Sequence, residues 1–326
     1  MIQEEMKKQV VGVDIKLKKT TIAIVDLRGN IIATDDFPSI DYPFIGDYVS
    51  VLSERILALV EQHGGYESIR SVGLSAPSGN NPTGSIVNSP NMPWKGVIPL
   101  AAMLRDRLGL AVALANNAYV TALGEHAFGA AHGLQNFITV SLGSGVGSCF
   151  FSNGQVHLGV DGFAGEFGHT CVEHNGRECG CGNKGCLEAY CAEKGIIRTA
   201  QELMAESDKP SLMREAEKLS YETIQAFCEQ GDELAIETYR RTGEILGIGL
   251  ANFASIVDPE AIILTGPGTK AGKWLIDPVN ESFEAHVFHN IENHVKLIIS
   301  TMDDHIRNIL GASVLAWEVK EYSLFK

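Results

Sequence analysis

The order of apolar and polar positions divides the chain into short strands and amphipathic helices. Apolar runs bounded by turn residues predict strands, and apolar residues that recur every three or four positions predict helices. The first strands are expected at Val10–Val13, Thr20–Asp26 and Ile31–Thr34, with a turn at Arg28-Gly29-Asn30 before the third. The chain is therefore predicted to begin with a β-meander.

Helices and strands continue to alternate after this meander. Tyr48–His63 has apolar residues at helical spacing and is followed by Gly64-Gly65, which signals a helix end. The next predicted elements are a strand in SVGLSAP, a helix at Pro99–Leu108, a strand in AVALANN and a helix at Ala118–Ala131.

The second half of the chain repeats the outline of the first. The segment FITVSLGSGVGSCFFSNGQVHLG contains a strand, a glycine-rich turn, a strand, a turn at Asn153-Gly154 and a strand. Helices dominate Glu193–Ile256, the strand AIILTG follows, and Asp304–Val319 forms a last helix. Two similar openings predict a duplicated α/β fold with nucleotide held between its halves. We place the domains at residues 1–117 plus 304–326 and at residues 118–303.

Charge and composition narrow the class of protein. The 326 residues include 26 basic and 40 acidic side chains, a net charge of -14 that opposes direct binding of nucleic acid. Neither a secretion signal nor a run of about 18 apolar residues is recognisable, so a cytoplasmic protein without a membrane segment is expected. A DNA-binding repressor would need a winged-helix segment, and only nine residues precede Val10.

A cluster of thiols and one imidazole indicates a metal site. His169, Cys179, Cys181 and Cys186 match the ligand set of a closed, tetrahedral structural zinc, which would order the loop that carries them. Cys171 and Cys191 are alternative ligands. The other interpretation is that all of these are free thiols, although three cysteines within eight residues beside a histidine argue against it.

The same region carries a family resemblance. GVDGFAGEFGHT followed by CGCGNKGCLE closely resembles the ROK family of repressors, unassigned frames and sugar kinases, over nearly the whole chain. The resemblance implies a two-lobed, actin-like (ribonuclease-H-like) α/β sugar-kinase fold with an interlobe cleft. It also implies that Glu166, His169 and Glu188 bind sugar hydroxyls, with His169 also ligating zinc. Charged carboxylates suit this task because they accept strong hydrogen bonds from hydroxyls. The alternative for both glutamates is a solvated surface position.

Two glycine-rich loops are candidates for nucleotide and phosphate binding. Leu142–Gly147 resembles the family's second phosphate loop, with Gly143, Ser144, Gly145 and Gly147 as its candidate residues; a tight hairpin turn is the alternative. Gly266 and Gly268 resemble the adenosine loop. Pro267 between them is expected to stiffen that loop and remove a backbone donor.

The chain departs from the family pattern at two positions. Family kinases have Asp-x-Gly-Gly-Thr after the first strand, whereas this chain has Asp14-Ile15-Lys16-Leu17-Lys18. The lysines either attract phosphate or form a solvated hairpin. The family's catalytic base lies in Asn-Asp-Ala, where this chain has Asn116-Asn117-Ala118, and an amide cannot serve as a base. Asp14 is retained and is the other candidate catalytic residue.

Two functional hypotheses follow from these departures. The first is a hexose-binding ROK protein whose kinase chemistry is weak or lost, acting as a sugar sensor. The second is an active ATP-dependent hexokinase of the glucokinase or N-acylhexosamine kinase type, with Mg-ATP as cofactor. The predicted ligand is a hexose or N-acylhexosamine, and the resemblance implies a homo-oligomer. The further residues expected to contact the sugar are Asn116, Asn117 and Gly79, together with Ser78 and Asn91 in the loop after SAP.

Overall fold

A computed structural model of the protein describes residues 7–89 and 92–319, so Asn91 lies outside the described residues. The chain forms two compact units. Unit 1 comprises Met1–His132, Leu158–Phe163 and Thr301–Lys326, and unit 2 comprises Gly133–His157 and Ala164–Ser300. None of the helices among the described residues has the length and apolar character needed to cross a membrane.

Unit 1 is built on a five-stranded sheet with the order β3-β2-β1-β4-β8. The three N-terminal strands are antiparallel, as the meander predicted, and β1, β4 and β8 are parallel. The strands are β1 (Gln9–Ile15), β2 (Thr20–Asp26), β3 (Ile31–Phe37), β4 (Ile69–Ala76) and β8 (Ala111–Asn116). A small separate sheet contains β5 (Gly79–Asn80), β6 (Ser85–Val87) and β7 (Val97–Ile98).

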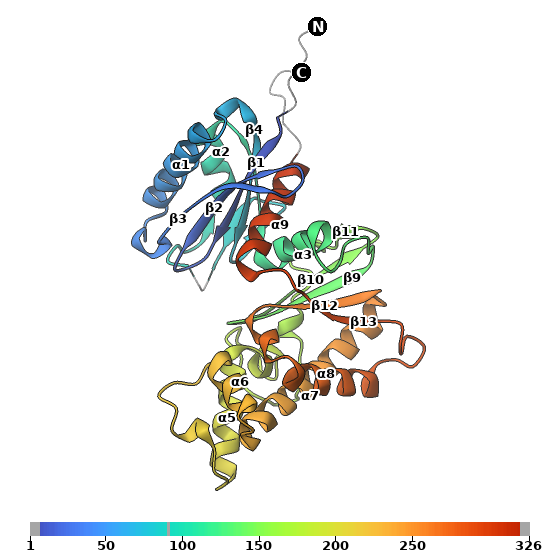
Figure 1. The fold of residues 1–326 in the computed structure, drawn as a ribbon. Helices are drawn as coiled ribbons and strands as arrows, with labels where there is room; N and C mark the ends of the chain where they lie inside the picture. Colours follow the sequence, from blue (N-terminus) through green and yellow to red (C-terminus); the bar gives the residue numbers. More distant parts are fainter. Residues whose placement is uncertain (1–6, 90–91, 320–326) are drawn as a thin grey trace. The chain divides into compact units, whose positions relative to one another are not determined.

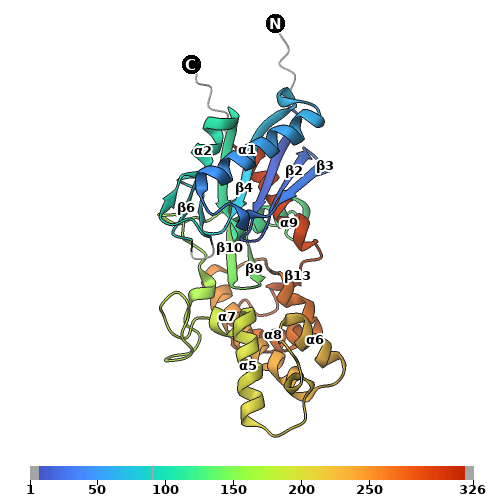
Figure 2. The same cartoon turned by 90° about the vertical axis from the view of Figure 1, so that its left-hand side faces the viewer.

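Helices cover both faces of the main sheet of unit 1 (Figure 1 and Figure 2). Side chains alternate along a strand, so the Val11 and Val13 side chains pack with α1 and α2, while that of Val10 packs with α9. Gly73 permits the close approach of α9, since a Cβ there would lie 2.0 Å from the Ala312 carbonyl oxygen. The helices are α1 (Ile45–Gln62), α2 (Leu100–Leu108), α3 (Asn117–Phe128) and α9 (Asp304–Glu318).

Unit 2 repeats this sheet topology in the order β11-β10-β9-β12-β13. Its first strands are antiparallel and its last three are parallel, which confirms the predicted duplication. At the predicted turn, Asn153 and Gly154 both have positive φ, at 54° and 73°. The strands are β9 (Phe137–Leu142), β10 (Val146–Ser152), β11 (Gln155–Val156), β12 (Ala261–Thr265) and β13 (Lys296–Ile299).

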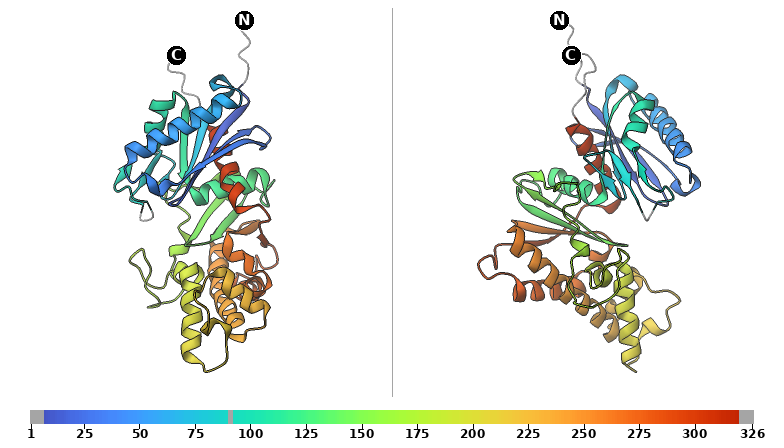
Figure 3. Two further views of the ribbon diagram at one scale, coloured as in Figure 1. Left: turned by 60° about the vertical axis from the view of Figure 1, so that its left-hand side comes forward. Right: turned by 180° about the vertical axis from the view of Figure 1, so that it is seen from behind.

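Helices from the C-terminal half pack together in unit 2 (Figure 3). α8 and β13 were not predicted; in α8, Pro278 interrupts an otherwise helical pattern. Gly247 of α7 allows α8 to pack closely, since a Cβ there would lie 2.6 Å from the Ser282 Cβ. The helices are α4 (Glu188–Cys191), α5 (Glu193–Glu206), α6 (Tyr221–Glu229), α7 (Glu233–Val257) and α8 (Lys273–His286).

The two units differ from the predicted domains at their boundary. The prediction ended the N-terminal domain at residue 117, whereas the first segment of unit 1 extends to His132 and so includes α3. α3 packs against α9 within this unit. Gly311 permits the contact, because a Cβ there would lie 1.9 Å from the Val120 carbonyl oxygen.

Candidate functional site

The predicted metal ligands converge in unit 2. The donor atoms of His169, Cys179, Cys181 and Cys186 all lie within 4.8 Å of one another. His169 Nδ1 is 3.6 Å from Cys179 Sγ, and Cys181 Sγ is 3.7 Å from Cys186 Sγ. A zinc ion bound tetrahedrally, with bonds of about 2.0 Å to nitrogen and 2.3 Å to sulfur, would separate its donors by about 3.6–3.8 Å. The four residues therefore fit one tetrahedral metal ion.

The backbone around these ligands folds into a tight double turn. Two antiparallel bridges, between Cys171 and Cys186 and between Glu178 and Lys184, bring the two arms of the loop together. Gly185 has φ of 73°, and a Cβ there would lie 1.9 Å from the Glu173 carbonyl oxygen, so no other residue fits.

The two alternative ligands, Cys171 and Cys191, do not join the metal group, which consists of His169, Cys179, Cys181 and Cys186. The Cys171 thiol lies 3.6 Å from the Glu173 carbonyl oxygen, and the buried Cys191 thiol lies 3.8 Å from that of Thr242.

Burial raises the pKa of the Cys186 thiol to about 12, so this thiol stays protonated unless a cation lies beside it.

Arg177 connects the metal loop, residues 171–186, to α4 and α5. Its side chain is 10% exposed, and its guanidinium lies 4.6 Å from the centre of the Tyr190 ring. The guanidinium donates hydrogen bonds to the carbonyl oxygens of Ala189 and Gly195, to Thr199 Oγ1 and to Glu202 Oε2. Hydrogen bonds from a charged donor are stronger than those between neutral groups.

Replacing this anchor should weaken metal binding. Arg177→Met is expected to lower zinc affinity by about 10–100-fold, the range seen when groups that support metal ligands are lost. Competition with a chromogenic chelator measures the affinity. Arg198→Met is the matched control, because Arg198 also binds Glu202 but does so at the helix surface, 2.8 Å away and 52% exposed. Equal affinities for the two variants would contradict the anchoring role of Arg177.

The two predicted sugar carboxylates differ in their contacts. Glu166 is exposed, and its Oε2 lies 4.0 Å from His169 Nε2. His169 therefore turns one ring nitrogen toward the thiols and the other toward a carboxylate. Glu188, the first residue of α4, accepts a hydrogen bond of 2.9 Å from the Val146 N–H. This contact with the glycine loop was not anticipated from the sequence.

The two glycine-rich loops lie side by side in unit 2. Residues 143–145 connect β9 and β10, and Gly147 lies in β10. The nearest atom to a Cβ on Gly143 would be Pro267 Cδ, at 3.9 Å. Burial raises the pKa of Tyr221, which stays protonated and donates to the Gly143 carbonyl oxygen at 2.8 Å. Tyr221 was not recognised from the sequence.

Pro267 lies at the start of a helical turn. It is the first residue of a short 3-10 helix, Pro267–Ala271, whose N-cap is Gly266. A helix leaves the first N–H groups without intrahelical partners, so proline removes a donor that the helix does not use. Gly266 is required by close packing, since a Cβ there would lie 2.5 Å from the Leu142 carbonyl oxygen. Ser144 is exposed on the facing loop.

In unit 1, Asp14 is buried at the end of β1 and already has two partners. Its Oδ2 lies 2.9 Å from Lys16 Nζ, and its Oδ1 accepts a 3.2 Å hydrogen bond from Asn308 Nδ2. The Lys16 side chain is 49% exposed but reaches back along the hairpin to this carboxylate, whose side chain is 4% exposed. Lys19 pairs with Asp36 at 3.2 Å. These lysines lie in the turn between β1 and β2, and Lys16 has a specific partner there.

Asn116 and Asn117 lie where β8 ends and α3 begins. Asn116 caps the helix, since its Oδ1 accepts a 2.7 Å hydrogen bond from the Tyr119 N–H. Asn117 Oδ1 accepts a 3.0 Å hydrogen bond from the Ser75 hydroxyl on β4. Gly79 is buried, and a Cβ there would lie 2.6 Å from the Ala115 carbonyl oxygen, so it also has a packing role.

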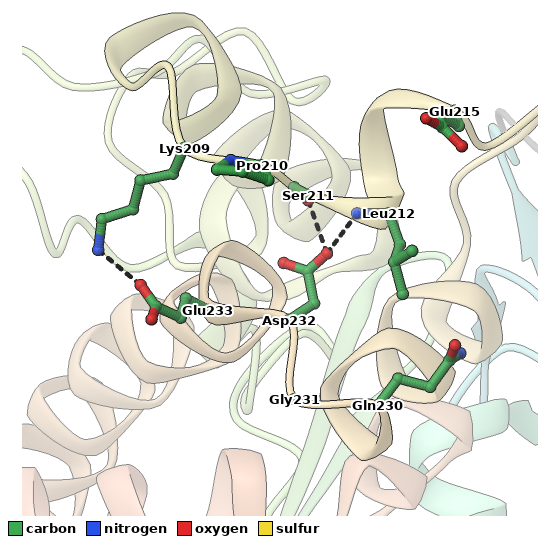
Figure 4. A pocket seen from close by; sticks show the side chains of 9 residues that line it. All are labelled: Lys209, Pro210, Ser211, Leu212, Glu215, Gln230, Gly231, Asp232 and Glu233. Atoms are coloured by element: carbon green, nitrogen blue, oxygen red, sulfur yellow. Dashed lines mark hydrogen bonds and ion pairs between the residues drawn. The ribbon is translucent and has the colours of Figure 1, made fainter.

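A pocket elsewhere in unit 2 contains none of the predicted site residues. Its volume is ≈ 580 Å³, and it is lined by residues 209–212, 215 and 230–233 (Figure 4). Asp232 is the N-cap of α7 and also accepts hydrogen bonds from the Ser211 hydroxyl and the Leu212 N–H. Lys209 pairs with Glu233 at 2.7 Å. These polar groups thus bind one another.

Two units with one sheet topology, the second carrying a Cys/His cluster and a glycine loop, define an α/β protein of the sugar-kinase fold class. Comparison with known proteins identifies the branch of this class. The chain belongs to the ROK family, whose family model matches residues 10–319.

Relatives of both kinds, enzymes and regulators, resemble this chain. A glucokinase from Halalkalibacterium halodurans is 30% identical over 95% of this chain and 94% of its own length. A xylose repressor from Bacillus subtilis is 28% identical over 90% of this chain and 73% of its own length. A solved ROK family glucokinase from Streptomyces griseus, in complex with glucose and AMPPNP, is 27% identical with a TM-score of 0.79, covering 95% of this chain and 100% of that chain.

Proposed function

We propose that this protein binds a hexose or N-acylhexosamine on a glucokinase-like scaffold and that its phosphoryl transfer is weak or lost. The proposed sugar contacts are Glu166, His169 and Glu188 in unit 2, with Asn116, Asn117 and Gly79 in unit 1. The proposed role is that of a cytoplasmic sugar sensor.

The ion pair between Lys16 and Asp14 is the observation that carries this proposal. The buried carboxylate lies where, by the family resemblance, kinases hold metal and phosphates, and Lys16 Nζ lies 2.9 Å from it. A lysine that neutralises this carboxylate competes with a divalent cation for the same oxygen. Lys16 also stands where the family has glycine, and its side chain hinders a close approach of phosphate to the backbone.

The position of the expected base supports the same conclusion. Asn117 Oδ1 accepts the Ser75 hydroxyl proton in a 3.0 Å hydrogen bond, and an amide oxygen cannot take up a proton near neutral pH. Asn117 can orient a sugar hydroxyl through its NH₂ group. Loss of a general base costs about 10²–10⁴-fold in rate, so slow turnover is compatible with this site.

The sugar side has the groups that hexose binding requires. Glu166 and Glu188 supply carboxylate oxygens, and His169 supplies a ring nitrogen directed toward Glu166. The proposed metal is a structural zinc held by His169, Cys179, Cys181 and Cys186, whose donors fit a closed tetrahedral site. Zinc would fix the loop and the histidine tautomer without taking part in phosphoryl transfer.

Sugar binding can be tested by removing charge from the two carboxylates. Glu166→Gln and Glu188→Gln should each lower hexose affinity by about 10–100-fold, because each loses a charge-assisted hydrogen bond worth about 1.5–3 kcal/mol. Isothermal titration with a panel of hexoses and N-acylhexosamines measures this. Glu178→Gln is the control, since Glu178 lies on the same loop but its side chain is 84% exposed. Unchanged affinity in both variants would exclude this sugar site.

The second candidate function is an active ATP-dependent hexokinase. The adjacent glycine loops, at Gly143–Gly147 and Gly266–Gly268, favour it because they leave backbone groups near one another for a nucleotide. Mg-ATP, when bound, would supply the phosphoryl group. A coupled ADP-release assay with the hexose panel decides between the two functions. Turnover at about 1–100 s⁻¹, the usual range for kinases, that Asp14→Ala abolishes would contradict the sensor.

Two further predictions concern partners. The acidic net charge of -14 predicts that the isolated chain does not bind DNA, and a gel shift with the purified chain tests this. The family resemblance predicts a homo-oligomer, which sedimentation analysis would measure.

A further inference from the structure

We infer that Cys171 and Cys186 form a site of thiol oxidation, in which peroxide links them as a disulfide and removes one donor from the metal group. Cys171 is exposed, and Cys186 is buried among the metal-group residues. The part of the inference that concerns metal rests on the metal site proposed above. The part that concerns the disulfide rests on the geometry of the loop alone.

The two cysteines are direct cross-strand partners in an antiparallel bridge. The flanking hydrogen bonds run from the Val172 N–H to the Gly185 carbonyl and from the Leu187 N–H to the Thr170 carbonyl, at 2.8 and 3.0 Å. This pattern makes Cys171 and Cys186 a non-hydrogen-bonded pair, in which the Cα atoms are about 4.5 Å apart and the side chains share one face. Disulfides span Cα separations of about 4.4–6.8 Å. The backbone can therefore accept the link without a large movement.

The sulfur of Cys171 already lies toward the partner arm. A Cβ built on Gly185, the neighbour of Cys186, would lie 3.1 Å from Cys171 Sγ. Cys171 is also outside the metal group, so its oxidation does not require the metal to leave first. Cys179 and Cys181, in contrast, would have to give up a metal bond before the first step, whereas Cys186 gives up its bond only in the second step, when it attacks the Cys171 sulfur.

The reaction balances with peroxide as the only co-reactant. The Cys171 sulfur attacks one peroxide oxygen, the O–O bond breaks, and a sulfenic acid and one water form. The Cys186 sulfur then attacks the Cys171 sulfur, and the second oxygen leaves as water. Two thiols lose two electrons and two protons, and peroxide is reduced to two waters. The metal group then retains only His169, Cys179 and Cys181, so its affinity for metal falls.

The test compares the intact chain, loaded with zinc, with two variants during peroxide treatment. Zinc release is followed with a chromogenic chelator, and linked peptides are identified by mass spectrometry. Combined cleavage after glutamate and by trypsin isolates residues 167–173 and 185–188, each with a single cysteine. We expect these two peptides to become linked as zinc is released. Cys171→Ser should lose the linked species and the rapid release, whereas Cys228→Ser, at a buried position on α6, should behave as the wild type.

The outcomes separate this inference from the function on which it partly rests. Equal zinc release by wild type and Cys171→Ser, or a link confined to residues 179–184, would overturn the inference. If the chain binds no zinc, the metal proposal fails, and the metal-free protein still tests the pair by its linked peptides. Absence of the 171–186 link in that sample would also overturn the inference.

Discussion

Asn117→Asp is expected to raise the rate of hexose-dependent ADP release by about 10²–10⁴-fold, the usual contribution of a general base. The substitution keeps the oxygen that accepts the Ser75 hydroxyl and adds a carboxylate that can take up a proton. Because residue 117 is the first residue of α3, the helix dipole also stabilises the added charge. A coupled assay of ADP release with each hexose measures the effect.

The control for this substitution lies one residue away. Asn116→Asp adds the same charge and keeps the cap on the Tyr119 N–H, but it places no carboxylate at position 117, so it should not raise the rate. The test should be repeated in a Lys16→Gly background, which removes the amine beside Asp14. A wild-type chain that already turns over rapidly, and a rate that Asn117→Asp does not change, would show that the base lies elsewhere.

Arg307→Met is expected to lower the free energy of unfolding by about 3–5 kcal/mol, because it removes one partner of a buried ion pair. Arg307 on α9 lies 2.8 Å from Glu125 on α3, and their side chains are 6% and 0% exposed. The pair joins the helix that begins with Asn117 to the helix that carries Asn308, the partner of Asp14. Urea unfolding measures the loss.

Two further variants show whether the loss arises from the buried charge. Glu125→Gln combined with Arg307→Met should recover part of the stability, since the amide oxygen can still accept from the Ala130 N–H. Arg105→Met removes an exposed pair with Asp106, for which a change of about 0–1 kcal/mol is expected. A similar small change for Arg307→Met would exclude a structural role for the buried pair.

Much of the fold was predictable because its signals are local. Short apolar runs with turns between them identified both meanders, and the repeated order of strands predicted the duplication that the two sheets confirm. α8 was missed because Pro278 breaks the pattern on which helix prediction depends. The first segment of unit 1 extends past the predicted domain end, because packing on α9, which no local pattern shows, brings α3 into unit 1.

The sequence by itself determined the Cys/His cluster and the departures from the family pattern. The ligands are close along the chain, and tight turns rich in glycine bring them together, so their spacing was sufficient. Only the tertiary structure decided that Asp14 is bound by Lys16 and Asn308. The same is true of the cap that Asn116 provides for α3 and of the hydrogen bond that Glu188 accepts from the Val146 N–H. Asn308 is 294 residues from Asp14, and no local pattern encodes a contact over that separation. Such contacts arise when packed sheets and helices bring distant segments together, and they determine which side chains remain available to a ligand.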